Sequence, residues 1–76
     1  MAYPNPSQGR FQLKWEEKLI DPLPYRVFDA LGKKVREGEL ETGTNGFELD
    51  LAHHQPGIYF LEIQGKGRMK LIVQTQ

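Results

Sequence analysis

Hydrophobic and polar residues alternate along several short stretches of this chain, which is the period expected of a β-strand. The clearest stretch is residues 58–63, where one face is wholly apolar and the other is mostly apolar. The two faces are Tyr59, Leu61 and Ile63, and Ile58, Phe60 and Glu62. Because both faces suit burial, we predict a central strand that is covered on one side and partly shielded on the other.

A turn is predicted immediately before this strand. Pro56 sets the φ angle required at the second position of a type II turn, and Gly57 can adopt the positive φ required at the third position. The sequence therefore predicts a type II turn that leads directly into the central strand.

Five further segments carry strand patterns and are separated by residues typical of turns. They are residues 10–16 with Phe11, Leu13 and Trp15 on one face, residues 25–28, residues 33–40, residues 47–51 and residues 68–74. Phe11, Trp15 and Leu19 would also fit the spacing of a helix, but Gly9 and Leu13 favour a strand. Six short strands without a convincing helix predict an all-β sandwich.

Glycines mark the predicted connections. Asp29 suits the first position of a type I turn, and Gly32 suits the left-handed residue that closes such a hairpin. Gly38 lies inside the strand at residues 33–40 and predicts a bulge or a bend there. Residues 64–67 predict a second glycine-bearing hairpin loop before the closing strand.

The composition limits the possible functions. The 76 residues predict a single domain over residues 1–76 with a thin core. Ten lysine and arginine residues balance ten acidic residues, so the chain lacks the charge excess expected for binding nucleic acid or an anionic membrane. The absence of cysteine excludes disulfides, thiol catalysis and zinc–thiolate sites.

Targeting segments are not evident in the pattern. No apolar run approaches the roughly 20 residues of a membrane span, and we expect no signal peptide directly before the domain. We therefore expect no membrane insertion. We expect Met1 to be an added start residue, and the remainder to be the C-terminal part of a longer protein.

Candidate catalytic and metal-binding residues are few. His53 and His54 are neighbours, so in an extended segment their side chains point to opposite faces and do not easily share a metal ion. Ser7 is the only serine and lacks the Gly-x-Ser-x-Gly context of a hydrolase nucleophile. The carboxylates that could pair for glycoside hydrolysis are expected on solvated strand faces and in turns: Glu16, Glu17, Asp29 and Asp50. We therefore predict a protein that is not an enzyme and holds no metal ion or cofactor.

Aromatic residues offer one alternative function. Trp15, Tyr25 and Tyr59 could form a platform on which sugars stack, as in many small β modules. Trp15 falls in register with Phe11 and Leu13, which favours core packing for its side chain. A carbohydrate-binding or adhesion module of a secreted enzyme, using aromatics such as Trp15 and Tyr25, is the alternative that remains open.

Four sequence elements occur in a fixed order and together cover essentially the whole chain. They are Tyr3-Pro4-Asn5-Pro6, residues 27–32 (Val-Phe-Asp-Ala-Leu-Gly), residues 56–61 (Pro-Gly-Ile-Tyr-Phe-Leu) and residues 70–74 (Lys-Leu-Ile-Val-Gln). With these elements the chain resembles the C-terminal sorting domain of type IX secretion substrates, the Por secretion tail family (type A) of the Bacteroidetes group.

The resemblance implies a small immunoglobulin-like antiparallel β-sandwich of about six to seven strands, carried at the C-terminal end of a larger cargo protein. It also implies passage from the periplasm through an outer-membrane type IX translocon to the cell surface or medium, followed by removal by a sortase-like peptidase. The family landmarks fall on Tyr3, Pro4, Asn5, Pro6, Gly32, Pro56, Gly57, Tyr59 and Lys70, which are the recognition residues that we predict.

Two departures from the family pattern bear on these expectations. Many members carry a leucine three residues before the turn glycine, where this chain has His54, so we expect a looser or more exposed turn. The residues before Tyr3, where a short first strand and the cleavage region would lie, are almost absent. For recognition, the sequence suggests that a receptor reads the edge of the sandwich by its shape or by strand addition.

Overall fold

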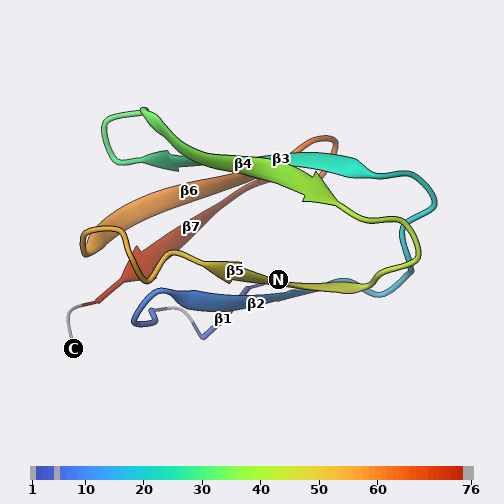
Figure 1. Cartoon of the computed structure of the whole chain (residues 1–76), viewed down its shortest axis with the longest axis horizontal. Coiled ribbons are helices and arrows are strands. Elements are labelled where there is room, and N and C mark those ends of the chain that lie inside the picture. Colours follow the sequence, from blue (N-terminus) through green and yellow to red (C-terminus); the bar gives the residue numbers. More distant parts are fainter. Residues whose placement is uncertain (1, 5, 75–76) are drawn as a thin grey trace.

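The computed structural model describes residues 2–4 and 6–74, which form two antiparallel sheets packed face to face (Figure 1). A three-stranded sheet has the order β1-β2-β5, and a four-stranded sheet has the order β4-β3-β6-β7. The described residues contain no helix, and the predicted all-β class is confirmed. The strands are β1 (Ala2–Tyr3), β2 (Arg10–Lys14), β3 (Leu23–Asp29), β4 (Lys34–Leu40), β5 (Gly46–Asp50), β6 (Gly57–Ile63) and β7 (Gly67–Val73).

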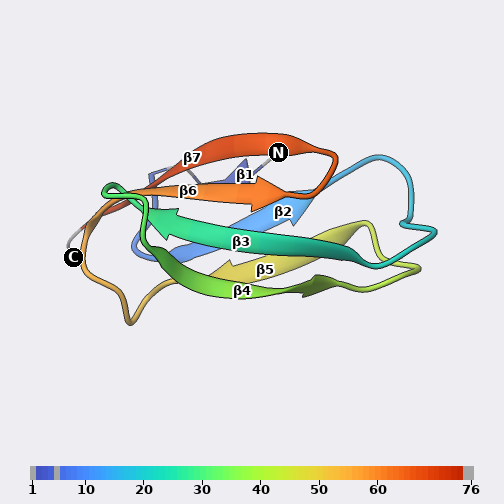
Figure 2. The same ribbon diagram turned by 90° about the horizontal axis from the view of Figure 1, so that it is seen from above.

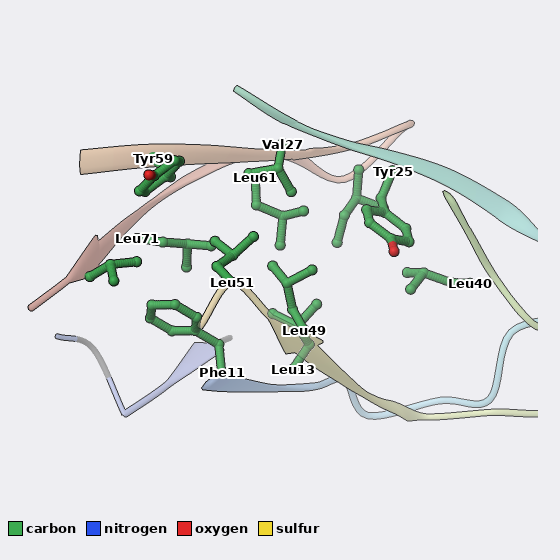
Figure 3. Close-up of a cluster of buried hydrophobic side chains, with 12 residues drawn as sticks. Phe11, Leu13, Tyr25, Val27, Leu40, Leu49, Leu51, Tyr59, Leu61 and Leu71 are labelled. Carbon is green, nitrogen blue, oxygen red and sulfur yellow. The ribbon is translucent and has the colours of Figure 1, made fainter. Parts of the chain in front are cut away.

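The core fills the space between the two sheets, and its residues alternate along the strands as the sequence predicts. Side chains from both layers point toward each other (Figure 3). Twelve hydrophobic residues are buried: Phe11, Leu13, Tyr25, Val27, Leu40, Leu49, Leu51, Tyr59, Leu61, Ile63, Leu71 and Val73. The predicted inward faces of residues 10–14 and 58–63 are therefore confirmed.

Strand β6 is central, as predicted. It pairs on one side with β3, where Phe60 lies opposite Phe28, and on the other side with β7, where Phe60 lies opposite Lys70. Seen from above in Figure 2, β6 and β3 occupy the interior of the four-stranded sheet. Strands β4 and β7 form its two edges.

The first hairpin has the predicted turn. The Gly32 amide donates a hydrogen bond to the Asp29 carbonyl at 3.0 Å, and Gly32 has a φ of 86°. The Asp29 carboxylate accepts hydrogen bonds from the amides of Leu31 and Lys33, each at 2.9 Å. The Asp29 side chain therefore stabilises this type I turn, which Gly32 closes in a left-handed conformation. It does so because its carboxylate accepts hydrogen bonds from exposed backbone amides.

The predicted bulge at Gly38 is wrong, because the register shift of β4 lies between the partners of Val27 and Phe28. Gly38 pairs regularly with Tyr25, and a Cβ atom at Gly38 would lie 2.8 Å from the Tyr25 ring. Glycine is therefore required because the aromatic ring of the neighbouring strand lies across its backbone. Such a contact depends on which residue is opposite, which the local sequence does not reveal.

The predicted type II turn at Pro56-Gly57 is also wrong. Gly57 has a positive φ, as predicted, but its value of 152° is far from the roughly +80° of a type II turn. The hydrogen-bonded turn lies earlier, where the His54 amide donates to the Leu51 carbonyl at 3.0 Å. Gly57 already belongs to β6 and pairs with Val73.

Trp15 lies beyond the end of β2, so the strand predicted for residues 10–16 is two residues too long. Its amide bonds to the Asn45 carbonyl at 3.1 Å, and its indole N–H donates to the Thr44 carbonyl at 2.9 Å. The half-buried ring packs against the core, as predicted. Through these two hydrogen bonds, Trp15 holds the loop before β5 against the end of β2.

Candidate recognition site

The chain places several predicted recognition residues at one end of the sandwich. There the turn at residues 29–32, the start of β6 and the end of β7 lie together (Figure 1). We call this region the β7 end and define it by residues 6–7, 29–32, 55–57 and 73–74. Gly32, Pro56 and Gly57 belong to it, and so does Pro6.

Strand pairing explains how these distant segments meet. Tyr59 lies opposite Asp29 on β3 and opposite Leu71 on β7, and Gly57 lies opposite Val73. Strands β3, β6 and β7 are neighbours in the sheet, and neighbouring strands are about 4.8 Å apart. The turn at residues 29–32, which follows β3, is therefore separated from the last residues of β7 by β6 alone. The arrangement depends on the folded sheet.

The opening segment joins the β7 end through a short parallel bridge between Ser7 and Val73. The Ser7 amide donates to the Ile72 carbonyl at 2.9 Å, and the Gln74 amide donates to the Ser7 carbonyl at 2.7 Å. Pro4 and Pro6 line a hollow of about 660 Å³ beside this bridge, together with Ser7 and Gln74. The beginning and the end of the described chain are therefore held together by backbone hydrogen bonds.

The other predicted residues lie apart from this junction or outside the description. Tyr3 sits on β1 opposite Gln12 and is exposed. Lys70 lies in the middle of β7, opposite Phe60. Asn5 lies outside the described residues. Recognition by these positions stays a prediction.

Tyr59 ties the loop before β6 to the sheet. Its ring is buried, and its hydroxyl donates a hydrogen bond of 2.5 Å to the Gln55 carbonyl. Burial raises the pKa of the Tyr59 phenol, and the nearby Asp29 carboxylate adds to this rise. The half-buried His54 ring packs edge-on against Tyr59 at 6.1 Å between centroids, so the residue that replaces the family's leucine also covers this tyrosine.

Ser7 and Asp50 each hold a nearby backbone amide through a side-chain hydrogen bond. The buried Ser7 hydroxyl accepts a hydrogen bond from the Gly9 amide at 2.9 Å. Asp50 accepts one from the Ala52 amide at 2.8 Å, and this bond holds the pKa of its carboxyl below the usual value. Among residues 2–4 and 6–74, no three histidine, aspartate or glutamate side chains gather closely enough to hold a metal ion.

The aromatic residues considered for the alternative carbohydrate-binding function do not form a shared stacking platform. Tyr25 is buried in the core, with its ring 5.2 Å from that of Phe47. Trp15 is half-buried and uses its indole N–H within the protein. Tyr25 therefore faces the core, whereas Trp15 lines a small hollow of about 230 Å³ together with Leu19 and Met69.

Sequence reasoning missed a surface on the outer side of the four-stranded sheet. Phe28 and Phe60 lie opposite each other on β3 and β6, and the Arg68 guanidinium lies 5.8 Å from the centroids of both rings. We call this surface the outer aromatic face. By strand alternation it comprises Arg26, Phe28, Ile58, Phe60, Glu62, Arg68, Lys70 and Ile72, and it is bordered on β4 by Lys34 and Glu37, which lie opposite Phe28 and Arg26. The alternation within residues 24–28 and 68–72 was the available signal.

No helix among the described residues is long and apolar enough to cross a membrane. Comparison with known proteins finds that the family model of the secretion system C-terminal sorting domain matches residues 1–74. No curated protein matches the chain. Among solved structures, a single-mutant thermostable endoglucanase from Alicyclobacillus acidocaldarius is similar, with 21% identity and a TM-score of 0.59 over 93% of this chain and 13% of that chain. At this identity, the likeness to the endoglucanase shows a shared fold alone.

Proposed function

This chain belongs to the secretion system C-terminal sorting domain family, and from that premise we propose that it directs a larger cargo protein across the outer membrane by the type IX route. The cargo would precede the domain in the same chain. The domain would act as a recognition module, without catalysis of its own.

The meeting of distant segments at the β7 end is the observation that carries this proposal. Residues 6–7, 29–32, 55–57 and 73–74 come together only when the sheets form. A receptor that reads them would therefore read a folded domain rather than a linear peptide. This suits a signal that a machine recognises by shape.

The type IX route also indicates which proteins this domain would meet. We propose that an outer-membrane type IX translocon binds the domain after the protein has entered the periplasm. A sortase-like peptidase would then remove the domain and leave the cargo at the cell surface or in the medium.

Export of a reporter tests the proposal. Residues 1–76 are fused behind a fluorescent protein that carries a periplasmic signal peptide, and the fusion is expressed with and without a working type IX translocon. We expect surface or medium fluorescence only in the strain with the translocon. Reporter that stays in the periplasm of both strains would refute the sorting role.

A core variant separates a folded signal from a linear one. Leu61 is fully buried, so Leu61→Asp places a charge in the core and prevents folding while leaving every predicted recognition residue in the sequence. We expect this fusion to remain unexported. Export at the level of the unmodified fusion would show that the signal is a linear segment.

A further inference from the structure

We infer that the outer aromatic face is the surface on which this domain docks onto a partner protein of the secretion machinery. The partner surface would present a carboxylate next to apolar side chains. This inference rests on the proposed sorting function and names the surface that would serve it.

The apolar part of the face lies on the two central strands. Ile58 is 43% exposed although it is aliphatic, and Phe28 and Phe60 are only half-buried. Ile58 lies opposite Ile72 on β7, which extends the patch toward the edge of the sheet. No described segment of the chain crosses these strands on this side, so the patch faces solvent (Figure 1).

Charged side chains border the patch. Glu62 lies between two arginines, with one carboxylate oxygen 3.6 Å from Arg26 and the other 3.3 Å from Arg68. Arg26 also lies opposite Glu37 of β4, so Arg26 has a carboxylate on each side, whereas Arg68 shares Glu62 with it. A carboxylate from a partner would add to the hydrogen bonds of Arg68, because an arginine can donate more than one.

A shallow groove runs past the same cluster. It has a volume of about 400 Å³ and is lined by Pro24, Arg26, Glu62 and Arg68, with Gly65 and Gly67 from the hairpin between β6 and β7. Neither glycine position has another atom within 4 Å of where a Cβ would lie, so the hairpin leaves its side of the groove open. An acidic side chain could reach the arginines there while its neighbours cover the phenylalanines.

The outer face of the three-stranded sheet provides the contrast. Its charged and polar side chains are paired with each other: Gln12 donates to Glu48 at 2.7 Å, and Arg10 lies 3.8 Å from Asp50. Apolar residues in strands β2 and β5 are directed to the core instead. On the four-stranded sheet, the exposed Ile58 and the half-buried phenylalanines therefore lie beside arginines, which is a pattern expected of an interface.

Two variants of the exported reporter test this inference, each at an exposed position. Arg68→Glu reverses the charge beside the groove, and Ile58→Glu places a charge in the patch. The matched control is Arg10→Glu, which reverses a similarly exposed, ion-paired arginine on the other sheet. We expect export to fall at least about tenfold for Arg68→Glu and Ile58→Glu, and to stay within about twofold for Arg10→Glu. Circular dichroism of the purified chain verifies the fold of each variant.

The outcomes separate this inference from the proposed function. If the unmodified reporter is not exported, the sorting role fails. If it is exported and a folded Arg68→Glu or Ile58→Glu variant is exported equally well, only the docking surface is refuted. If one of the two variants does not fold, the export of the other variant decides whether this face is the docking surface.

Two other occupants are tested with the purified chain. Sedimentation that shows a dimer, with dissociation of the dimer by Ile58→Glu, would assign the face to a second copy of this chain and overturn the inference. Binding to phosphatidylglycerol vesicles that Arg68→Glu abolishes would assign it to an anionic lipid and overturn it as well. A monomer that does not bind the vesicles, together with the export result, supports a protein partner.

Discussion

The three-stranded and four-stranded sheets bury similar inner faces and expose outer faces of different chemistry. Inside, Phe11 and Leu13 of β2 meet Leu61 and Leu71 of the opposite sheet (Figure 3). Outside, the three-stranded sheet carries paired polar side chains, whereas the four-stranded sheet carries half-buried phenylalanines and exposed Ile58. Both inner faces must be apolar because they form the core. The outer faces are not constrained in this way and can therefore differ.

This difference separates stability from recognition. A small domain needs both inner faces because a 76-residue chain has only about 4–11 kcal/mol of net stability. The outer faces contribute little to that total, since most exposed positions tolerate substitution within about 0.5 kcal/mol. Folding therefore explains the half-buried phenylalanines better than it explains the exposed Ile58.

The largest expected effect tests whether the inner faces are equivalent. Phe11 and Leu61 are both fully buried, one in each sheet. We expect Phe11→Ala and Leu61→Ala each to lower the free energy of unfolding by about 2–5 kcal/mol, because each leaves a cavity. Urea unfolding followed by Trp15 fluorescence measures this. A loss of stability in only one of the two variants would show that the two inner faces are not equivalent.

The next effect compares one strand glycine from each sheet. A Cβ at Gly38 would lie 2.8 Å from the Tyr25 ring, whereas a Cβ at Gly46 would lie 3.5 Å from the Leu13 carbonyl oxygen. We expect Gly38→Ala to destabilise the domain by about 1–3 kcal/mol through overpacking. Gly46→Ala should be neutral or stabilise it by up to about 1 kcal/mol. Thermal unfolding of both variants measures the contrast, and equal melting temperatures would contradict it.

A smaller effect compares the two outer faces. Phe60→Thr keeps a good strand former but removes the contacts with Phe28 and the Arg68 guanidinium. We expect a loss of about 1 kcal/mol in the free energy of unfolding. Glu48→Thr on the three-stranded sheet removes one exposed hydrogen bond, and we expect a change of about 0.5 kcal/mol or less. Equal losses in urea unfolding would show that the outer faces do not differ in this way.

The smallest effect concerns the β7 end. Tyr59→Phe removes the hydrogen bond to the Gln55 carbonyl, and we expect a loss of about 1 kcal/mol or less near neutral pH. Because burial raises the pKa of Tyr59, its phenol ionises more readily in the unfolded chain. Its contribution is therefore complete below the ordinary value of 10.0 and is lost as the pH rises through the folded-state pKa. Unfolding measured against pH should show a weaker alkaline decline in Tyr59→Phe, and an unchanged decline would contradict this role.

The local pattern predicted the parts of the fold that depend on neighbours in the sequence. Alternation identified the buried faces around Phe11 and Leu61, and the turn chemistry of Asp29 and Gly32 identified the first hairpin. Each of these follows from residues within a few positions of one another. Local preference and tertiary packing agree there, so sequence reasoning succeeds.

Features that depend on distant partners could not be predicted in the same way. Gly38 is required by the Tyr25 ring on another strand, and Trp15 leaves β2 to bond with Thr44. Gly57 has a φ of 152° and already pairs with Val73 in β6, so the turn lies earlier in the chain than the Pro-Gly pattern indicates. The candidate docking cluster is of the same kind, because Arg26, Glu62 and Arg68 meet only when β3, β6 and β7 are in register.

The bridge between Ser7 and the residues at the end of β7 has a consequence for timing. On the ribosome, Ser7 is made well before its partners Ile72 and Gln74. A polypeptide whose synthesis stops before residue 72 lacks both partners and cannot form the junction. A receptor that requires this junction would therefore leave behind translation products that stop within the domain before residue 72.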